Sequence, residues 1–240
     1  MTKLTRKIWL ALHRLVNGDR FAVHGVKVTV PQNVDSEIRY ILARKRPYEV
    51  PEARFVQTYL APGTHVVELG GSIGVISTLV RRQIGPEALH IIVEANPELA
   101  AVCKHNASAE VKPDCTVMIE AAVDYSGAAQ VMFDFGHNAH TGRVSSQGHP
   151  VPTTTLAQVS SLLPDGPAAL VCDIEGAELD LIIAETEVLK RFELIILETH
   201  PHAYIDGSKS LAKMLDLLVS YGFAQAEDAD DVLVFTRAKQ

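Results

Sequence analysis

The stretch His65-Val66-Val67-Glu68-Leu69-Gly70-Gly71-Ser72-Ile73-Gly74 decides the fold of this chain. It starts as an apolar run, reaches a carboxylate at Glu68 and then turns through three glycines. A helical pattern continues from Val75 to Arg82. A strand, a tight loop and a helix N-terminus in this order form the first βα turn, where open α/β sheets bind nucleotide-like ligands. The stretch therefore predicts a ligand site at one edge of such a sheet.

The glycine spacing indicates which kind of ligand this loop accepts. A dinucleotide fingerprint reads G-x-G-x-x-G, but Ser72 and Val75 stand where its second and third glycines belong. Glu68 would also repel a pyrophosphate, whereas its carboxylate can accept hydrogen bonds from an ammonium group. The loop therefore disfavours NAD and favours a ligand with an amino-acid tail. We expect that ligand to contact Glu68 and the loop residues Gly70, Gly71, Ser72, Ile73 and Gly74.

A second carboxylate extends this interpretation. Glu94 lies twenty residues beyond Gly74, at the end of an apolar run over residues 90–93. A carboxylate at the tip of the neighbouring strand can accept two hydrogen bonds from a ribose diol, although Glu94 alone would favour a solvated strand end. Together the two sites describe an adenosine that carries an amino acid, which is S-adenosylmethionine. The residues expected around it are Ala95 and Asn96 after the second strand and Ala121, Ala122 and Val123 after the third, whose backbone amides can pair with the adenine edge.

Composition limits the class of protein. A chain of 240 residues, 47% hydrophobic and 21% charged, is long enough for one α/β domain with a small extension. The net charge of −7 argues against a nucleic-acid partner. Three widely spaced cysteines without a C-x-x-C pair indicate no disulfide framework or zinc site and favour a reducing, cytoplasmic location. No apolar run approaches the ~20 residues of a transmembrane helix, and we expect no secretory signal.

Strand and helix patterns alternate along most of the chain, which is typical of a parallel sheet covered on both faces. Only the acidic turn 227–231 separates the last two apolar runs, which is too short for a crossover helix, so those strands must be antiparallel. The expected helices are 52–60, 75–82, 97–106, 155–163, 177–190 and 210–221, and Asn96 can cap the one that starts at Pro97. The expected strands after the first are 90–93, 116–119, 130–133, 168–172, 194–197, 223–226 and 232–236.

The N-terminal residues 1–46 are predicted to form an extension to a domain over residues 47–240. Residues 3–16 read as a basic amphipathic helix, with an apolar face formed by Leu4, Ile8, Leu12, Leu15 and Val16. We expect this helix to pack onto the domain, with contact to an anionic membrane or a partner subunit through Trp9 as the alternative. Residues 20–30 alternate around His24-Gly25 and predict a hairpin.

Acidic and histidine residues gather after two further strands. The fourth strand ends in Asp173-Ile174-Glu175-Gly176-Ala177-Glu178, and the fifth ends in Glu198-Thr199-His200-Pro201-His202. In open α/β sheets the ligand lies beyond the carboxyl ends of the strands. We therefore expect these two loops to meet on one rim, next to the cofactor.

These motifs resemble the FkbM family of S-adenosylmethionine-dependent methyltransferases over roughly residues 45–205. The resemblance rests on the Tyr48-Glu49 pair, the loop 68–74, the Glu94-Ala95-Asn96-Pro97 turn and above all the segment 172–178 with its D-x-E-G-x-E pattern. The family usually has Asp at position 68 and Pro at position 95, and both departures are conservative. The resemblance implies a class I Rossmann-like α/β fold, with a mostly parallel seven-stranded sheet, helices on both faces and a C-terminal antiparallel hairpin. It also places Tyr48 and Glu49 near the cofactor entrance.

The family suggests methyl transfer to a hydroxyl oxygen of a sugar or small polyhydroxylated molecule, while the residues leave a nitrogen acceptor open. Such transfer is an in-line displacement, and a poorly acidic hydroxyl needs a base near it. We expect Asp173 to position the cofactor or substrate and either Glu175 or His200 to act as base. Glu178 is expected to begin a helix, where its carboxylate interacts favourably with the helix dipole. His202 is equally consistent with a structural and a functional role. A divalent ion between Asp173 and Glu198 is conceivable, but no metal is predicted.

Two further interpretations remain open from sequence. The irregular segment 134–150 is either a lid over the substrate or a solvated loop, with His137, Asn138, His140, Arg143 and His149 as its candidate contacts. The chain as a whole could also be an inactive S-adenosylmethionine-binding module with a regulatory or assembly role. That alternative predicts cofactor binding without turnover.

Overall fold

A seven-stranded sheet forms the centre of the computed structural model, which describes residues 3–109, 111, 115–135, 142–145 and 147–237. The strand order is β12-β13-β11-β10-β3-β4-β5. Strands β11, β10, β3, β4 and β5 run parallel, while β13 is antiparallel to β11 and β12 to β13. The predicted mostly parallel sheet with a C-terminal antiparallel hairpin is confirmed. Its strands are β3 (His65–Leu69), β4 (His90–Glu94), β5 (Thr116–Glu120), β10 (Ala168–Cys172), β11 (Leu194–Glu198), β12 (Phe223–Ala229) and β13 (Val232–Arg237).

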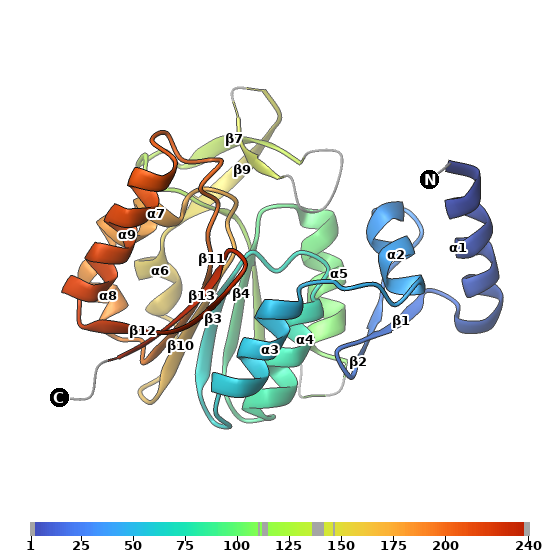
Figure 1. Ribbon diagram of the computed structural model, residues 1–240, viewed down its shortest axis with the longest axis horizontal. Helices are drawn as coiled ribbons and strands as arrows, with labels where there is room; N and C mark the ends of the chain where they lie inside the picture. Colours follow the sequence, from blue (N-terminus) through green and yellow to red (C-terminus); the bar gives the residue numbers. More distant parts are fainter. Residues whose placement is uncertain (1–2, 110, 112–114, 136–141, 146, 238–240) are drawn as a thin grey trace.

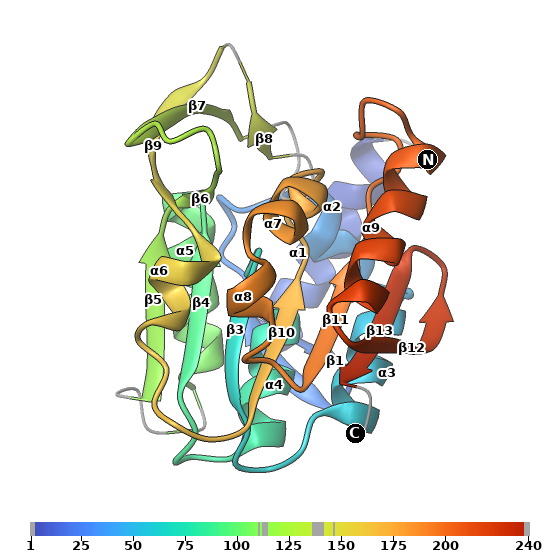
Figure 2. The same cartoon turned by 90° about the vertical axis from the view of Figure 1, so that its left-hand side faces the viewer.

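Helices cover both faces of this sheet (Figures 1 and 2). Val67 and Leu69 of β3 pack into one core with helices α6 to α9, whereas Val66 packs into a second core with α3 and α4. Because both faces are buried, the parallel strands are apolar along nearly their whole length. One face carries α3 (Val50–Tyr59), α4 (Val75–Ile84) and α5 (Pro97–Ala107), and the other carries α6 (Leu156–Ser160), α7 (Glu178–Ala184), α8 (Thr186–Leu189) and α9 (Ser208–Ser220).

The N-terminal extension packs beside α4 and α5. It contains α1 (Lys3–Asn17), the hairpin β1 (Arg20–Val23) and β2 (Val26–Thr29), and α2 (Ser36–Ala43). Helix α2 was not expected from the sequence, although the Asp35 carboxylate, which accepts a hydrogen bond from the Glu37 amide, is an N-cap signal. The Asn106 side chain bonds the backbone of Thr29 and the Ile73 carbonyl, and so joins the extension to the glycine loop.

A second, four-stranded sheet stands above the carboxyl edge of the central sheet (Figure 2). It contains β6 (Ala122–Val123), β7 (Gln130–Asp134), β8 (Arg143–Val144) and β9 (His149–Thr154). The strand expected at 130–133 therefore belongs to this sheet, and parts of the segment predicted to be irregular are strands. Of the candidate lid residues, His137, Asn138 and His140 lie outside the described residues.

Two expected elements differ from the structure. The helix predicted over 177–190 is divided into α7 and α8 at Glu185, whose backbone is not helical (φ −111°, ψ 31°). The carboxylate of Glu185 accepts a hydrogen bond from the Ala157 amide at the start of α6. The predicted acidic turn 227–231 is mostly strand, since β12 extends to Ala229 past an irregular pairing at Gln225 and Glu227. Only Asp230 and Asp231 then connect the last two strands.

Candidate functional site

A pocket of about 500 Å³ opens at the carboxyl ends of β3, β4 and β10, beneath the four-stranded sheet. This is the edge that the sequence predicts for the ligand. Its volume lies within the range of small-molecule and cofactor pockets. The predicted cofactor residues in its lining are Gly70, Ser72, Glu94, Ala95, Asn96, Ala122 and Asp173.

The glycine loop approaches β10 so closely that only glycine fits at its start. Gly70 has φ +91°, and a Cβ atom there would lie 1.8 Å from the carbonyl oxygen of Asp173. Ser72 is also left-handed, with φ 46°, and its backbone amide donates to Glu94. Gly71, Ile73 and Gly74 do not line the pocket and instead pack this turn against the fold. The loop therefore presents Gly70 and Ser72 to a ligand.

Glu94 is held in the pocket by backbone amides. One carboxylate oxygen accepts from the Ser72 amide at 2.8 Å and the other from the Asn96 amide at 2.8 Å. Burial raises the pKa of Glu94, against the effect of these hydrogen bonds. Asn96 in turn caps α5 by accepting from the amides of Glu98 and Leu99, as predicted. Because each carboxylate oxygen has two acceptor sites, Glu94 keeps acceptor capacity for a ligand hydroxyl.

Glu68 does not reach the pocket. Its side chain is buried, with one oxygen accepting from the Ser77 hydroxyl at 2.6 Å and the other 2.7 Å from Nε2 of His90. The expected contact of this carboxylate with a ligand ammonium group does not fit that position. Glu68 instead fixes the start of α4 and the neighbouring strand beneath the loop.

The residues expected next to the adenine ring lie in the pocket, but not all of their backbone amides are free. Ala121, Ala122 and Val123 line the pocket, but the Ala121 amide donates to the Glu94 carbonyl and is not free for a base edge. The aromatic side chains in this region were not expected from the sequence. Those that line the pocket lie in or beside the four-stranded sheet: Tyr125 follows β6, Phe133 is in β7 and Phe135 follows β7.

Tyr48 and Glu49 lie next to the glycine loop but do not line the pocket. Tyr48 is buried, and burial together with the adjacent Glu49 raises its pKa. Glu49 precedes α3 with a left-handed φ of 45°. Burial and the nearby carboxylates of Glu52 and Glu198 raise the pKa of Glu49 to about 8, despite a hydrogen bond with Tyr48 that lowers it.

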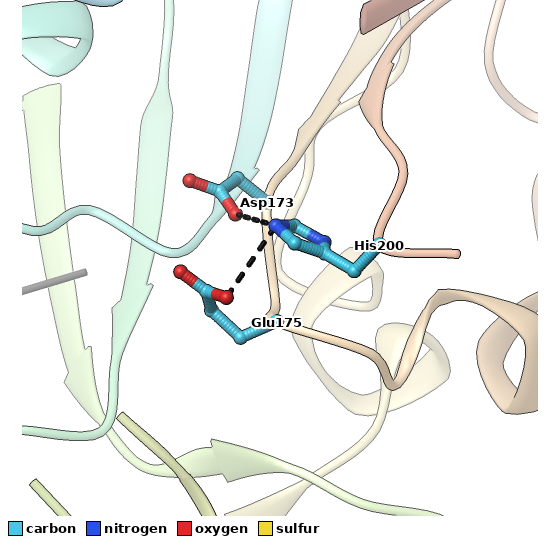
Figure 3. A group of neighbouring side chains, drawn as sticks. All are labelled: Asp173, Glu175 and His200. Atoms are coloured by element: carbon cyan, nitrogen blue, oxygen red, sulfur yellow. Dashed lines mark ion pairs between the residues drawn. The ribbon is translucent and has the colours of Figure 1, made fainter. Parts of the chain in front are cut away.

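Asp173, Glu175 and His200 meet at one rim of the pocket, as predicted (Figure 3). Nε2 of His200 lies 3.6 Å from Asp173 Oδ1 and 3.5 Å from Glu175 Oε2. Asp173 and Glu175 line the pocket, whereas His200 is buried behind them. Glu175 has a left-handed φ of 52°, an uncommon conformation for a residue with a side chain that often marks functional loops.

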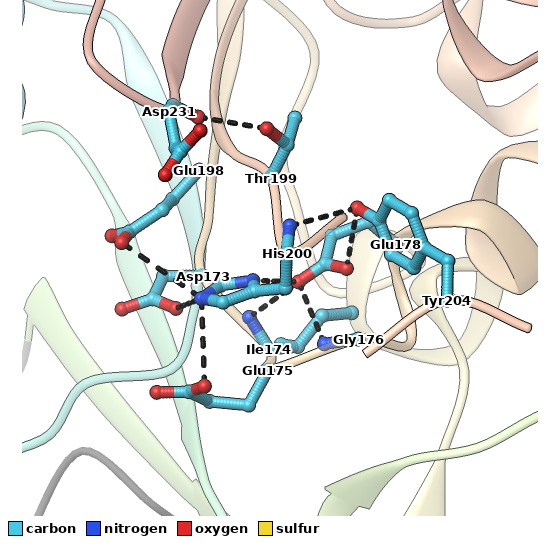
Figure 4. Close-up of polar contacts among 10 residues, drawn as sticks. All are labelled: Asp173, Ile174, Glu175, Gly176, Glu178, Glu198, Thr199, His200, Tyr204 and Asp231. Atoms are coloured by element: carbon cyan, nitrogen blue, oxygen red, sulfur yellow. Dashed lines mark hydrogen bonds and ion pairs between the residues drawn. The ribbon is translucent and has the colours of Figure 1, made fainter. Parts of the chain in front are cut away.

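The imidazole of His200 is oriented from behind by Glu178 (Figure 4). Nδ1 of His200 lies 2.8 Å from Glu178 Oε1, and the Tyr204 hydroxyl donates to the other oxygen at 3.0 Å. Burial alone would raise the pKa of Glu178, but the hydrogen bond from His200 and the backbone amides lower it. Burial opposes protonation of His200, yet Glu178 and the nearby Glu175 and Glu198 raise its pKa.

Several carboxyl groups lie close together at this rim, and the nearby positive charge does not balance their negative charges. Burial and the nearby Glu175 and Glu49 raise the pKa of Asp173 well above its ordinary value. Burial and the charge of Asp173 raise the pKa of Glu198 to about 9. Among the described side chains that line the pocket there is no lysine or arginine, although five carboxylates do so: Glu94, Asp124, Asp173, Glu175 and Asp180. The rim therefore favours a cationic ligand.

The side chains of Asp173, Glu175 and His200 are close enough together to hold a cation. One ligand atom each from Asp173, Glu175 and His200 lies within 4.8 Å of the others. The pair considered from sequence as ligands of a divalent ion was Asp173 with Glu198, whereas the described residues group Asp173 with Glu175 and His200. A protonated His200 can itself offset one negative charge of this group.

The comparison with protein families decides the assignment. Residues 63–224 match the model of the methyltransferase FkbM domain. The chain belongs to this family. It is therefore an S-adenosylmethionine-dependent methyltransferase, and the residues that line its pocket fit that cofactor: Gly70 leaves room for close approach, Glu94 offers a carboxylate acceptor, and the acidic rim suits a sulfonium cation.

One solved structure supports the fold of this FkbM-family methyltransferase. A putative rRNA-methylase from Clostridium thermocellum has a TM-score of 0.50 and 8% identity over 78% of this chain and 93% of that chain. Human methyltransferase 10 domain containing protein has a TM-score of 0.48 and 12% identity over 98% and 95%. Aeropyrum pernix fibrillarin, in complex with natively bound S-adenosyl-L-methionine, has a TM-score of 0.45 and 13% identity over 73% and 67%. A search of curated proteins gave no significant match.

Proposed function

We propose that this FkbM-family methyltransferase transfers the methyl group to a hydroxyl oxygen of a sugar or another small polyhydroxylated molecule. The observation that carries this proposal is the combination of Glu175 at the rim with aromatic and carboxylate side chains across the pocket. Carboxylates accept hydrogen bonds from hydroxyl groups, and the faces of Phe133 and Phe135 offer flat apolar surface to a ring. A small neutral acceptor with many hydroxyls matches both features.

The glycine-loop half of the pocket is assigned to the cofactor. Gly70 and Ser72 provide a close backbone surface, and Glu94 accepts hydrogen bonds from the ribose hydroxyls. Bound S-adenosylmethionine supplies a methyl group on a sulfonium, which passes to the acceptor oxygen as the C–S bond breaks and the sulfur keeps the electron pair. Asp173, at the boundary between the two halves, positions the reacting groups.

Glu175 is the general base in this proposal. Of the two candidates from sequence, it lines the pocket, whereas His200 is only 5% exposed. As the new O–C bond forms, the hydroxyl proton passes to the Glu175 carboxylate. His200 stands 3.5 Å behind that carboxylate and acts as a positioning residue, itself oriented by Glu178. Such proton transfer contributes about 10²- to 10⁴-fold to rate in enzymes.

Incubation with methyl-labelled S-adenosylmethionine and a panel of acceptors tests the proposal. The panel contains free sugars, glycans and small polyols, with amine-bearing analogues as a second arm. We expect label in the hydroxyl acceptors as a base-stable ether. If only the amine-bearing analogues are labelled, the acceptor atom is nitrogen and the proposal of a hydroxyl oxygen is wrong. Tight cofactor binding with no product from any acceptor would instead support an inactive binding module.

A further inference from the structure

One face of helix α1 packs onto the protein. Arg6 forms an ion pair with Glu37 of α2 at 3.4 Å, and the guanidinium of Arg44 lies over the Trp9 ring at 4.3 Å. Further along, the His13 ring stacks on Phe21 with centroids 4.5 Å apart. Figure 1 shows α1 at the end of the molecule, beyond α2 and remote from the sheet. These contacts join α1 to the rest of the extension over residues 1–46, and not to the domain over residues 47–240 as expected.

The opposite face of α1 is an exposed apolar stripe, formed by Ile8, Leu12, Leu15 and Val16. Their spacing of i, i+4, i+7 and i+8 places them on one side of the helix. They are 51%, 54%, 84% and 83% exposed, respectively. Single exposed apolar side chains are ordinary on soluble proteins, but a continuous stripe of them marks an interaction surface.

Basic groups border this apolar stripe on one side. Helix α1 contains four basic residues and no acidic one, although the whole chain has a net charge of −7. A groove of about 670 Å³ beside the stripe is lined by the polar side chains Lys7, Arg14, Gln32 and Arg39 and by the apolar Leu10, Ala11 and Leu15. Arg39 is buried and paired with Asp19 at 2.7 Å, so Lys7 and Arg14 provide the accessible positive charge. Positive charge next to exposed apolar side chains complements a surface that is itself both anionic and apolar.

We propose that α1 docks this methyltransferase on an anionic lipid bilayer, with the apolar stripe in the interface and the basic groove facing lipid headgroups. An amphipathic helix with basic residues beside its apolar face binds membranes in this way, lying parallel to the surface. At 15 residues the helix is ~22 Å long. No helix in the described part of the chain is long and apolar enough to cross a bilayer. A second copy that docks through the same helix would bring two basic α1 surfaces together, so it complements this face less well.

Sedimentation of the full chain with lipid vesicles tests the proposal. We expect binding to phosphatidylcholine vesicles that contain phosphatidylserine, and little binding to phosphatidylcholine alone. Lys7→Gln should weaken binding by about five-fold, and added salt should weaken it further. Trp9 is the only tryptophan in the sequence and is 40% exposed despite its contact with Arg44, so its fluorescence should shift to shorter wavelength with the anionic vesicles.

A matched pair of variants locates the contact. The double substitution Leu15→Ser and Val16→Ser should abolish vesicle binding, whereas Val219→Ser, an exposed apolar residue on α9, should not. Thermal unfolding of each variant checks that the fold is retained. Absence of binding to the anionic vesicles, or equal binding by the double variant, would overturn the proposal. Self-association that light scattering detects, and that the double variant loses, would reassign the stripe to a second copy. These outcomes are independent of methyl transfer.

Discussion

Glu178 and His200 are joined by a buried contact of 2.8 Å between Oε1 and Nδ1, although Glu178 begins α7 and His200 follows β11. The contact orients the imidazole so that Nε2 points to Asp173 and Glu175. Glu178 therefore does more than favour a helix N-terminus, which is the role that its sequence position indicated. It determines which histidine nitrogen faces the acidic rim.

Replacement of Glu178 by Gln tests this pair through stability. The pKa of Glu178 is lowered, so its contribution to stability is complete above its ordinary pKa of 4.5 and is lost as pH falls through the folded value. The pKa of His200 is raised, so its contribution is complete below 6.5 and is lost as pH rises through the folded value. Breaking a buried ion pair costs about 3–5 kcal/mol. Denaturant unfolding of Glu178→Gln should show a loss of this order near pH 6, with a flatter pH dependence.

Glu175→Gln tests the general base. We expect turnover to fall by about 10²- to 10⁴-fold, while cofactor affinity measured by calorimetry stays nearly unchanged. Burial raises the pKa of Glu175, so turnover of the parent enzyme should rise with pH through that elevated value. Glu187→Gln on the exposed surface of α8 is the matched control. A Glu175→Gln enzyme with full turnover would exclude the assignment.

Glu94→Ala tests the cofactor contact. Hydrogen bonds to a charged group contribute about 1.5–3 kcal/mol, so calorimetry should show cofactor affinity roughly ten- to hundredfold lower. Glu98→Ala, on the exposed start of α5, should bind as the parent does. If Glu94→Ala retains parental affinity, the ribose contact belongs to another residue.

Comparing Gly70→Ala with Gly63→Ala distinguishes the cost of a left-handed backbone from the cost of a steric clash with a neighbouring atom. A Cβ at Gly70 would meet the Asp173 carbonyl, whereas Gly63 has a similar positive φ of +83° with no atom within 4 Å of the added carbon. Gly63→Ala should therefore cost only the ~1–2 kcal/mol of a left-handed alanine. Gly70→Ala should cost more and should lose cofactor binding, as measured by thermal unfolding with and without the cofactor. Equal effects of the two substitutions would contradict the geometry of the loop.

Removal of divalent ions tests the acid–base interpretation of the rim. We expect enzyme treated with EDTA to keep its turnover, because His200 already supplies positive charge next to Asp173 and Glu175. Turnover lost on treatment and restored by added Mg²⁺ or Mn²⁺ would assign these three side chains as metal ligands instead. Parallel measurement of cofactor affinity distinguishes loss of chemistry from loss of binding.

Local patterns in the sequence determined most of the fold and half of the site. The apolar strand before Gly70 predicted the first βα turn, and the cap at Asn96 predicted the start of α5, because both depend on residues adjacent in the chain. The short connection before Val232 required an antiparallel hairpin for the same reason. Helix α2 was missed, since its eight residues carry only a weak signal at Asp35.

Only the tertiary structure decided which polar groups face the pocket. Glu68 and Glu94 both follow apolar runs, yet Glu68 is buried against His90 while Glu94 faces the ligand side. Glu68 pairs with Ile92, two residues before Glu94 on β4, so it lies deeper below the carboxyl edge of the sheet. Its partners come from elements that are separate in the sequence. The outward direction of the apolar stripe on α1 is likewise set by the contacts of its inner face. Sequence determined the types and spacing of residues, and packing between distant elements determined their partners.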